Sequence, residues 1–313
     1  MKRKYPINKE FFPFNELAAP HNRFAITMAR LFMHVPRFFL KDKKININKI
    51  TIDGYKDEKF DIYVLNKKDI KENAPCIIYF HGGGFVFEAT KSHYQLALKY
   101  AKDCDCKVIY VRYNLAPKYP FPYQQEEAFC ALKYVYEHAN ELKIDKARIG
   151  LTGDSAGATL AVTSVLLSHR YGYNIEPLFH LLSYPWLDGR GISDSNLRYT
   201  DVPMRNSKLS KKAHKYTDPN NIGFEAIYTS PVEIKDLSFM PPAYIEVAEF
   251  DSLHDDGIIY SKRLKEFKIE TELHEVKGTM HGYETKFNAP TTQKMISKRI
   301  EFIKKMFAKD NDF

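Results

Sequence analysis

The apolar residues of the chain recur with two periods, which together predict a sheet with helices between its strands. Short, wholly apolar runs are typical of buried parallel strands, and segments with apolar residues at every third or fourth position are typical of helices. Buried strands are expected at 76–80, 108–111, 147–152, 178–184, 243–248 and 269–276, and helices at 92–102, 124–142, from 156 onward, 257–267 and 291–307. This alternation predicts an α/β fold whose mostly parallel central sheet has about eight strands and is flanked by helices.

A different pattern precedes the first buried strand. Ile45 and Ile47 alternate with polar residues, Asp53-Gly54 is typical of a turn, and a second strand is expected at 60–65. Two strands joined by such a turn indicate an antiparallel hairpin at the start of the sheet.

Two segments do not follow this alternation and are expected to form a helical cap. The first carries a helical stripe of apolar residues (Phe24, Met28, Leu31, Phe32 and Val35), and the second is polar with scattered apolar residues (Trp186, Leu187, Leu197, Val202, Met204 and Leu209). Because neither can bury its apolar side chains alone, we expect them to pack on each other over the open end of the sheet. The predicted organisation is a two-part cap, 1–44 and 186–230, on one catalytic core formed by 45–185 and 231–313.

Composition excludes several functional classes. The 313 residues are 44% hydrophobic and 27% charged, which is ordinary for a globular protein and argues against extensive disorder. The net charge of +8 is spread along the chain in short lysine runs, so no nucleic-acid partner is expected.

No membrane or metal partner is expected from the sequence either. The apolar run at 24–40 is broken by Arg30, His34, Pro36 and Arg37, so neither a signal peptide nor stable membrane anchoring is predicted. The four cysteines lack metal-binding spacing, which favours reduced thiols and a cytoplasmic location.

Gly153-Asp154-Ser155-Ala156-Gly157 has the Gly-x-Ser-x-Gly form of a nucleophile turn. A predicted strand ends just before it and a predicted helix begins just after it, which is the context that such a turn requires. A serine held there presents its hydroxyl at a helix N-terminus, where developing negative charge is favoured. A glycine-rich turn with the serine as a helix cap is the alternative.

A second motif, His81-Gly82-Gly83-Gly84-Phe85, directly follows the strand at 76–80. Three consecutive glycines are costly in backbone entropy, so they are expected where the backbone must turn sharply or approach another group. The N–H groups of Gly83, Gly84 and Ala156 are the candidates for an oxyanion hole beside Ser155.

A serine nucleophile needs a base and a group that orients the base. His281 follows the last predicted strand and Asp251 follows the strand before it, and the order Ser155, Asp251, His281 is the hydrolase order. Glu249, Asp255 and Asp256 compete with Asp251 for the role of the acid, but they lie earlier in the strand or later in the turn.

These motifs, together with 113–122 and 250–257, make the chain similar to the hormone-sensitive-lipase-like family of carboxylesterases. The resemblance covers roughly residues 75 to 285 and implies an α/β-hydrolase fold, a two-part cap and hydrolysis of short- to medium-chain acyl esters without a metal or cofactor. Side chains expected to contact the substrate are Phe85, Trp186, Leu187, Met204 and Tyr283.

The chain departs from that family at four positions. Asn114, Lys118, Ala158 and Ser252 stand where the family usually has Arg, Glu, Gly and Pro, and the first two put the contacts of their loop in doubt. Alternatives that stay open are a non-catalytic small-molecule receptor on the same fold, an amidase and a long-chain lipase. The natural ester and the oligomeric state are not fixed by the sequence, and a homodimer is the candidate state.

Overall fold

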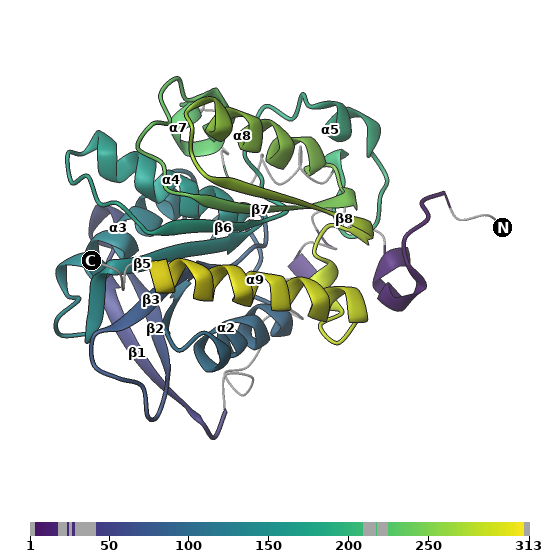
Figure 1. Cartoon of the computed structure of the whole chain (residues 1–313). Coiled ribbons are helices and arrows are strands. Elements are labelled where there is room, and N and C mark those ends of the chain that lie inside the picture. The colour runs from purple at the N-terminus through teal and green to yellow at the C-terminus, as the bar shows by residue number, and fades with distance from the viewer. Residues whose placement is uncertain are drawn as a thin grey trace.

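The computed structural model describes residues 4–17, 24, 27, 28, 42–208, 217 and 225–309. These residues form one eight-stranded sheet with the strand order β1-β2-β4-β3-β5-β6-β7-β8. Figure 1 shows the twisted sheet crossing the molecule, with helices against both of its faces. The α/β architecture and the number of strands expected from the sequence are therefore confirmed.

The strands are parallel except at one edge. β2 pairs antiparallel with both β1 and β4, and the remaining neighbours are parallel. The strand bounds are β1 Ile45–Asp53, β2 Lys59–Lys67, β3 Ala74–Phe80, β4 Lys107–Arg112, β5 Ile144–Asp154, β6 Phe179–Ser183, β7 Ala243–Phe250 and β8 Thr271–Met280. The hairpin predicted from the early alternating pattern is the antiparallel pair β1 and β2.

The helices cover the two faces of the sheet in two groups. α2 (Lys91–Asp103) and α9 (Pro290–Ala308) lie on one face, and α3 (Tyr123–Glu137), α4 (Ala156–Arg170) and α8 (His254–Glu266) lie on the other. Neighbouring residues of one strand join different cores: Ile78 packs in the cluster with α3, and Tyr79 packs in the cluster with α2. This explains why the strands are apolar throughout, because both of their faces are covered.

The two largest differences between predicted and observed element ends are at a helix and at the last strand. The helix expected at 124–142 ends at Glu137, where the N–H of His138 closes the last turn and a series of turns follows. The last strand continues past 276 to Met280, because Gly278 adopts φ 69° at an irregularity of the β7–β8 pairing instead of ending the strand. The longer strand carries the chain directly to His281.

The described parts of the predicted cap touch each other. Ile7 and Phe11 of the N-terminal segment are buried in a small core near Tyr184. The N–H of Met204 donates to the carbonyl of Leu17 at 3.1 Å, so this segment contacts the insertion. Short helices α5 (Asp194–Arg198) and α7 (Ala226–Thr229) lie within the insertion.

Mutual burial of the two apolar stripes stays a prediction. Leu31, Phe32, Val35 and Leu209 lie outside the described residues, and Phe24 is 75% exposed. Within the described ranges, none of the helices combines the length and the apolar character needed to cross a bilayer.

Candidate active site

Ser155 occupies a sharp turn between β5 and α4. Its backbone has φ 56° and ψ −120°, a combination that a non-glycine residue adopts only under strain. The neighbouring Gly157 cannot be replaced without rearrangement, because an added Cβ would lie 2.1 Å from the carbonyl oxygen of Phe80. The strand–turn–helix context expected for the Gly-x-Ser-x-Gly motif is therefore present.

Three side chains from the ends of three strands form a hydrogen-bonded line. His281 Nε2 lies 2.9 Å from Ser155 Oγ, and His281 Nδ1 lies 2.7 Å from Asp251 Oδ2. The other carboxylate oxygen of Asp251 accepts the backbone N–H of Leu253 at 2.9 Å. An acceptor at Nδ1 favours the tautomer with the proton on that nitrogen, which leaves Nε2 free to accept the proton of the serine hydroxyl.

The competing carboxylates have other partners. Asp256 accepts two backbone N–H groups of the insertion, at 3.2 and 3.1 Å. Asp255 accepts the N–H of Ser195 at 2.7 Å, and Glu249 accepts the N–H of Gly278 at 2.7 Å. Of the four acids weighed from the sequence, Asp251 is the one that the structure brings to His281.

The glycine loop after β3 lies against the nucleophile turn. The N–H of Gly82 donates to Asp154 Oδ2 at 3.0 Å. Gly83 has φ 123°, where a Cβ would meet a backbone oxygen at 2.5 Å. The N–H groups of Gly83, Gly84 and Ala156 donate to no other residue in the described part of the chain. Three donors are thus available on the two segments that flank Ser155 Oγ.

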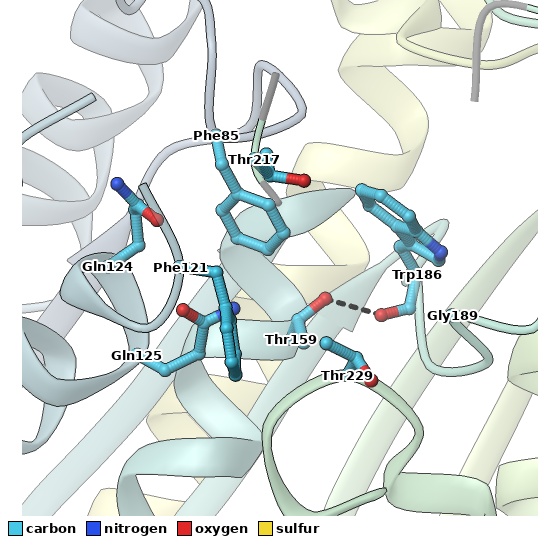
Figure 2. A pocket seen from close by; sticks show the side chains of 9 residues that line it. All are labelled: Phe85, Phe121, Gln124, Gln125, Thr159, Trp186, Gly189, Thr217 and Thr229. Carbon is cyan, nitrogen blue, oxygen red and sulfur yellow. Dashed lines mark hydrogen bonds between the residues drawn. The ribbon is translucent and has the colours of Figure 1, made fainter. Parts of the chain in front are cut away.

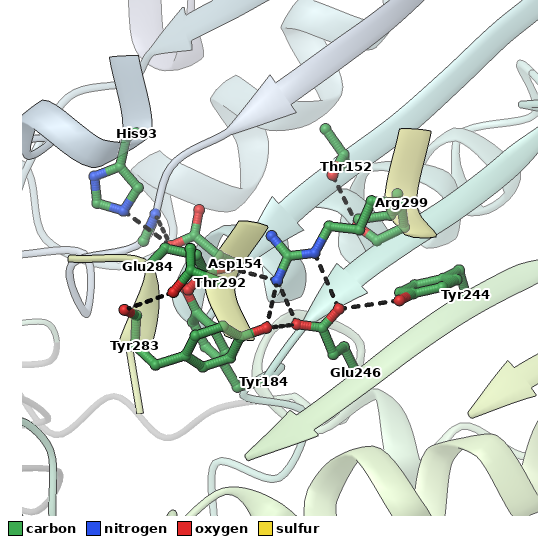
Figure 3. Close-up of polar contacts among 12 residues, drawn as sticks. His93, Thr152, Asp154, Tyr184, Tyr244, Glu246, Tyr283, Glu284, Thr292 and Arg299 are labelled. Carbon is green, nitrogen blue, oxygen red and sulfur yellow. Dashed lines mark hydrogen bonds and ion pairs between the residues drawn. The ribbon is translucent and has the colours of Figure 1, made fainter. Parts of the chain in front are cut away.

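Asp154 links these two segments through a buried carboxylate. Its Oδ1 accepts the hydroxyl of Tyr79 at 3.0 Å, and its Oδ2 lies 3.0 Å from His93 Nε2 of α2 (Figure 3). Burial is the largest influence and lowers the pKa of His93, but the charge of Asp154, its hydrogen bond to the ring and the charge of Glu284 together outweigh burial and raise that pKa. The sequence indicated Asp154 only as part of a motif and gave no signal for His93.

A second buried network holds the segment that follows His281. Arg299 of α9 pairs with Glu246 of β7 and with Glu284, and its Nη2 also donates to the hydroxyl of Tyr283 at 3.0 Å (Figure 3). Tyr283, expected to contact the substrate, is fully buried in this network. Its hydroxyl is hydrogen-bonded to Glu246 and Arg299 in the interior of the protein, and the residue does not line the cavity described below.

A cavity of about 10 Å³ lies beside the nucleophile turn. Its described lining comes from the glycine loop, the start of α3, α4 and the insertion (Figure 2): Phe85, Phe121, Gln124, Gln125, Thr159, Trp186, Gly189, Thr217 and Thr229. Phe85 and Trp186 stack with ring centroids 5.6 Å apart, so two of the expected substrate contacts form its wall. Leu187, which is fully buried in the core, and Met204 are not among these lining residues.

Arg205 of the insertion is a residue that the sequence did not single out. Its guanidinium lies 5.0 Å from the ring centroid of Trp186, and Nη1 donates to Ser252 Oγ at 3.0 Å. Ser252 follows Asp251 and is one of the four departures from the family pattern. The sequence alone could not distinguish Arg205 from an exposed basic residue, because its burial depends on contacts with residues distant in the chain.

The loop whose contacts the other departures put in doubt is held by hydrogen bonds. Asn114 donates both its backbone N–H and its side-chain amide to Glu127, each at 2.7 Å. Burial raises the pKa of Glu127 to about 7. Lys118 donates to the hydroxyl of Tyr119 at 2.8 Å.

No cluster of three or more His, Cys, Asp or Glu side chains suited to a metal ion occurs among the residues that the structure describes.

Comparison with known proteins agrees with the fold. Residues 77–285 match a protein-family model described as the alpha/beta hydrolase fold. Esterase LipI of Mycobacterium tuberculosis is 34% identical over 212 residues, which are 67% of this chain and 66% of LipI. Carboxylesterase NlhH of the same species is 29% identical over 255 residues, 80% of this chain and 79% of NlhH.

Solved structures of esterases share the fold of this chain. A bacterial heroin esterase is 25% identical with a TM-score of 0.86, covering 96% of this chain and 98% of that one. Esterase LipW from Mycobacterium marinum shares the fold with a TM-score of 0.87, at 22% identity and 96% coverage of both chains. The chain belongs to the α/β-hydrolase family, in its hormone-sensitive-lipase-like carboxylesterase group. It is a carboxylic ester hydrolase.

Proposed function

We propose that the protein hydrolyses short- to medium-chain acyl esters through a covalent acyl-enzyme on Ser155. His281 accepts the hydroxyl proton as Ser155 attacks the ester carbonyl, and Asp251 orients the imidazole and stabilises its protonated form. The N–H groups of Gly83, Gly84 and Ala156 receive the oxyanion. His281 then protonates the leaving alcohol, and water releases the acyl group by the same steps in reverse.

The hydrogen-bonded line from Ser155 to His281 to Asp251 carries this proposal. Its two contacts, 2.9 and 2.7 Å, fall within the range required of a nucleophile, its base and the group that orients the base. The unpaired N–H groups on both flanking segments add the electrostatic component, which is usually the largest contribution in such sites.

A preference for short acyl chains follows from the cavity beside Ser155. Phe85 and Trp186 narrow it to about 10 Å³, and the cavity as described holds roughly one water-sized group. A long acyl chain would have to displace these rings, so turnover is expected to fall as the chain lengthens.

A panel of p-nitrophenyl esters from acetyl to lauroyl, assayed with the native enzyme and with Ser155→Ala, tests the proposal. Loss of the nucleophile is expected to lower kcat by roughly 10⁶-fold. Ser164→Ala is the matched control, because Ser164 is a buried serine of α4, the helix that follows Ser155. Its hydroxyl donates to the carbonyl of Ala161 at 2.9 Å. More than a tenth of native activity in Ser155→Ala would refute the role of this serine.

A receptor function is the alternative from a different class. Receptors on this fold lack the catalytic histidine, whereas His281 is present here with both ring nitrogens engaged. Amide cleavage is tested by adding a p-nitroanilide to the panel. The cytoplasmic location and the homodimer stay predictions from the sequence.

A further inference from the structure

The cavity beside Ser155 has a polar wall that the hydrolytic mechanism does not use. The amide nitrogen of Gln124 donates hydrogen bonds to the carbonyl oxygens of Asn114 and Tyr119, at 2.8 and 2.7 Å. These two bonds fix the orientation of the amide, so Oε1 is an acceptor. That oxygen is buried and accepts no hydrogen bond from the residues described.

Gln125 is a stronger anomaly. The residue is 2% exposed, and its amide oxygen Oε1 is buried without a hydrogen-bond partner among the described residues. A buried amide without a partner destabilises the fold, and an apolar side chain of the same shape would avoid that cost. Such a residue calls for an explanation other than packing.

Among the lining residues that the structure describes, none forms a hydrogen bond with the two unpaired amide oxygens. Figure 2 shows the two glutamines on one side of the cavity and Trp186 on the other, with the ring of Phe85 between them in this view. The hydroxyl of Thr159, a potential donor, is already bound to the carbonyl of Trp186. A ligand group would therefore meet both aromatic rings and unpaired amide oxygens in this cavity.

The cavity adjoins the position of the reacting carbonyl. Phe85 directly follows Gly84, Thr159 lies about one helical turn after Ser155, and the N–H of Trp186 donates to the carbonyl of Ser155 at 3.2 Å. Because these lining residues adjoin the glycine loop, the helix that follows Ser155 and the backbone of Ser155, an acyl chain on Ser155 Oγ is expected to extend toward this wall.

We propose that the preferred acyl group is short and carries a hydroxyl, which binds the amides of Gln124 and Gln125; this rests on the proposed esterase function. A hydroxyl has one donor and two lone pairs, so it can donate to Gln124 Oε1 and at the same time accept an N–H of Gln125, whose amide turns its nitrogen toward the ligand. Water held there in the resting enzyme would be replaced by a group that makes the same bonds. An unsubstituted chain removes that water and leaves the amides unpaired.

Matched pairs of p-nitrophenyl esters test this specificity. Glycolate is compared with propanoate, and 3-hydroxypropanoate with butanoate, so that within each pair a hydroxyl replaces a methyl group of similar size. The measured quantity is the ratio of kcat/KM within a pair. Differences in intrinsic reactivity cancel when the ratio for a variant is divided by the ratio for the native enzyme.

Gln125→Leu and Gln125→Met are the test variants, because removing this amide breaks no hydrogen bond in the described structure. For at least one pair, we expect the preference for the hydroxy ester to fall about tenfold. The melting temperature is expected to rise. Tyr260→Phe is the matched control: its hydroxyl is also buried without a partner, but it lies on α8 outside the cavity lining, so the ratios should not change.

The possible results separate failure of the proposed specificity from failure of the esterase function. Ratios within about twofold of native for both pairs in both variants would overturn the specificity while leaving the esterase function intact. A lower melting temperature in both variants would assign Gln125 a structural role and overturn it equally. If the native enzyme hydrolysed none of the four esters and none of the acyl panel, the proposed function itself would fail.

Discussion

Replacing Asp251 by Asn probes how the carboxylate controls His281. The backbone N–H of Leu253 donates to Asp251 Oδ1 at 2.9 Å, so an asparagine would keep its oxygen there and turn its NH₂ toward His281 Nδ1, where Oδ2 now lies at 2.7 Å. An amide donor at that position requires a lone pair on Nδ1, which moves the ring proton to Nε2. Nε2 could then no longer accept the proton of Ser155.

The expected loss in kcat is about 10⁴-fold, which corresponds to about 5.4 kcal/mol of transition-state stabilisation. Steady-state hydrolysis of an acetyl ester measures it, and circular dichroism checks that the fold is intact. Asp256→Asn is the control: burial, followed by the charge of Asp188, raises the pKa of Asp256 to about 8, so a neutral amide resembles its state near neutral pH. Comparable losses in the two variants would refute the assignment of the acid.

Three further outcomes are expected. Arg299→Met should lower the free energy of unfolding by about 3–5 kcal/mol, measured by urea denaturation, because it leaves Glu246 buried without its charged partner. The raised pKa of Asp256 contributes stability that is present below the unfolded value of about 4 and is lost as the pH rises through about 8. The native urea midpoint should therefore fall between about pH 5 and 8 and level off above that, and it should fall less steeply in Asp256→Asn. Arg205→Lys should lower stability by about 1 kcal/mol in a thermal melt, since an ammonium cannot stack flat on the indole or keep the same bond to Ser252.

Much of the fold could be predicted because its strands and helices have distinct local periods. The parallel strands are apolar on both faces, so each is recognisable in the sequence. Ser155, Asp251 and His281 directly follow β5, β7 and β8, so the edge of the sheet at which they lie could be inferred. The order of strands in the sheet is a different matter, since β4 lies between β2 and β3 and no local pattern encodes this.

The parts of the site that could not be predicted depend on partners distant in sequence. His93 meets Asp154 from 61 positions away, and Arg299 meets Glu246 from 53 positions away. Tyr283 was expected at the substrate because it follows His281 closely, but its direction is set by its contacts with Arg299 and Glu246. The last strand was expected to end at 276, but it continues through Gly278, whose positive φ within an irregular strand pairing suits glycine.

The strained backbone at Ser155 has a consequence for laboratory evolution of this enzyme. A serine with φ 56° and ψ −120° costs roughly 1–3 kcal/mol, which a glycine at the same position would largely recover. Libraries screened only for heat resistance would consequently enrich sequences that have lost the nucleophile. Each round of such a selection needs a turnover measurement beside the thermal one, or the most robust clones will be inert.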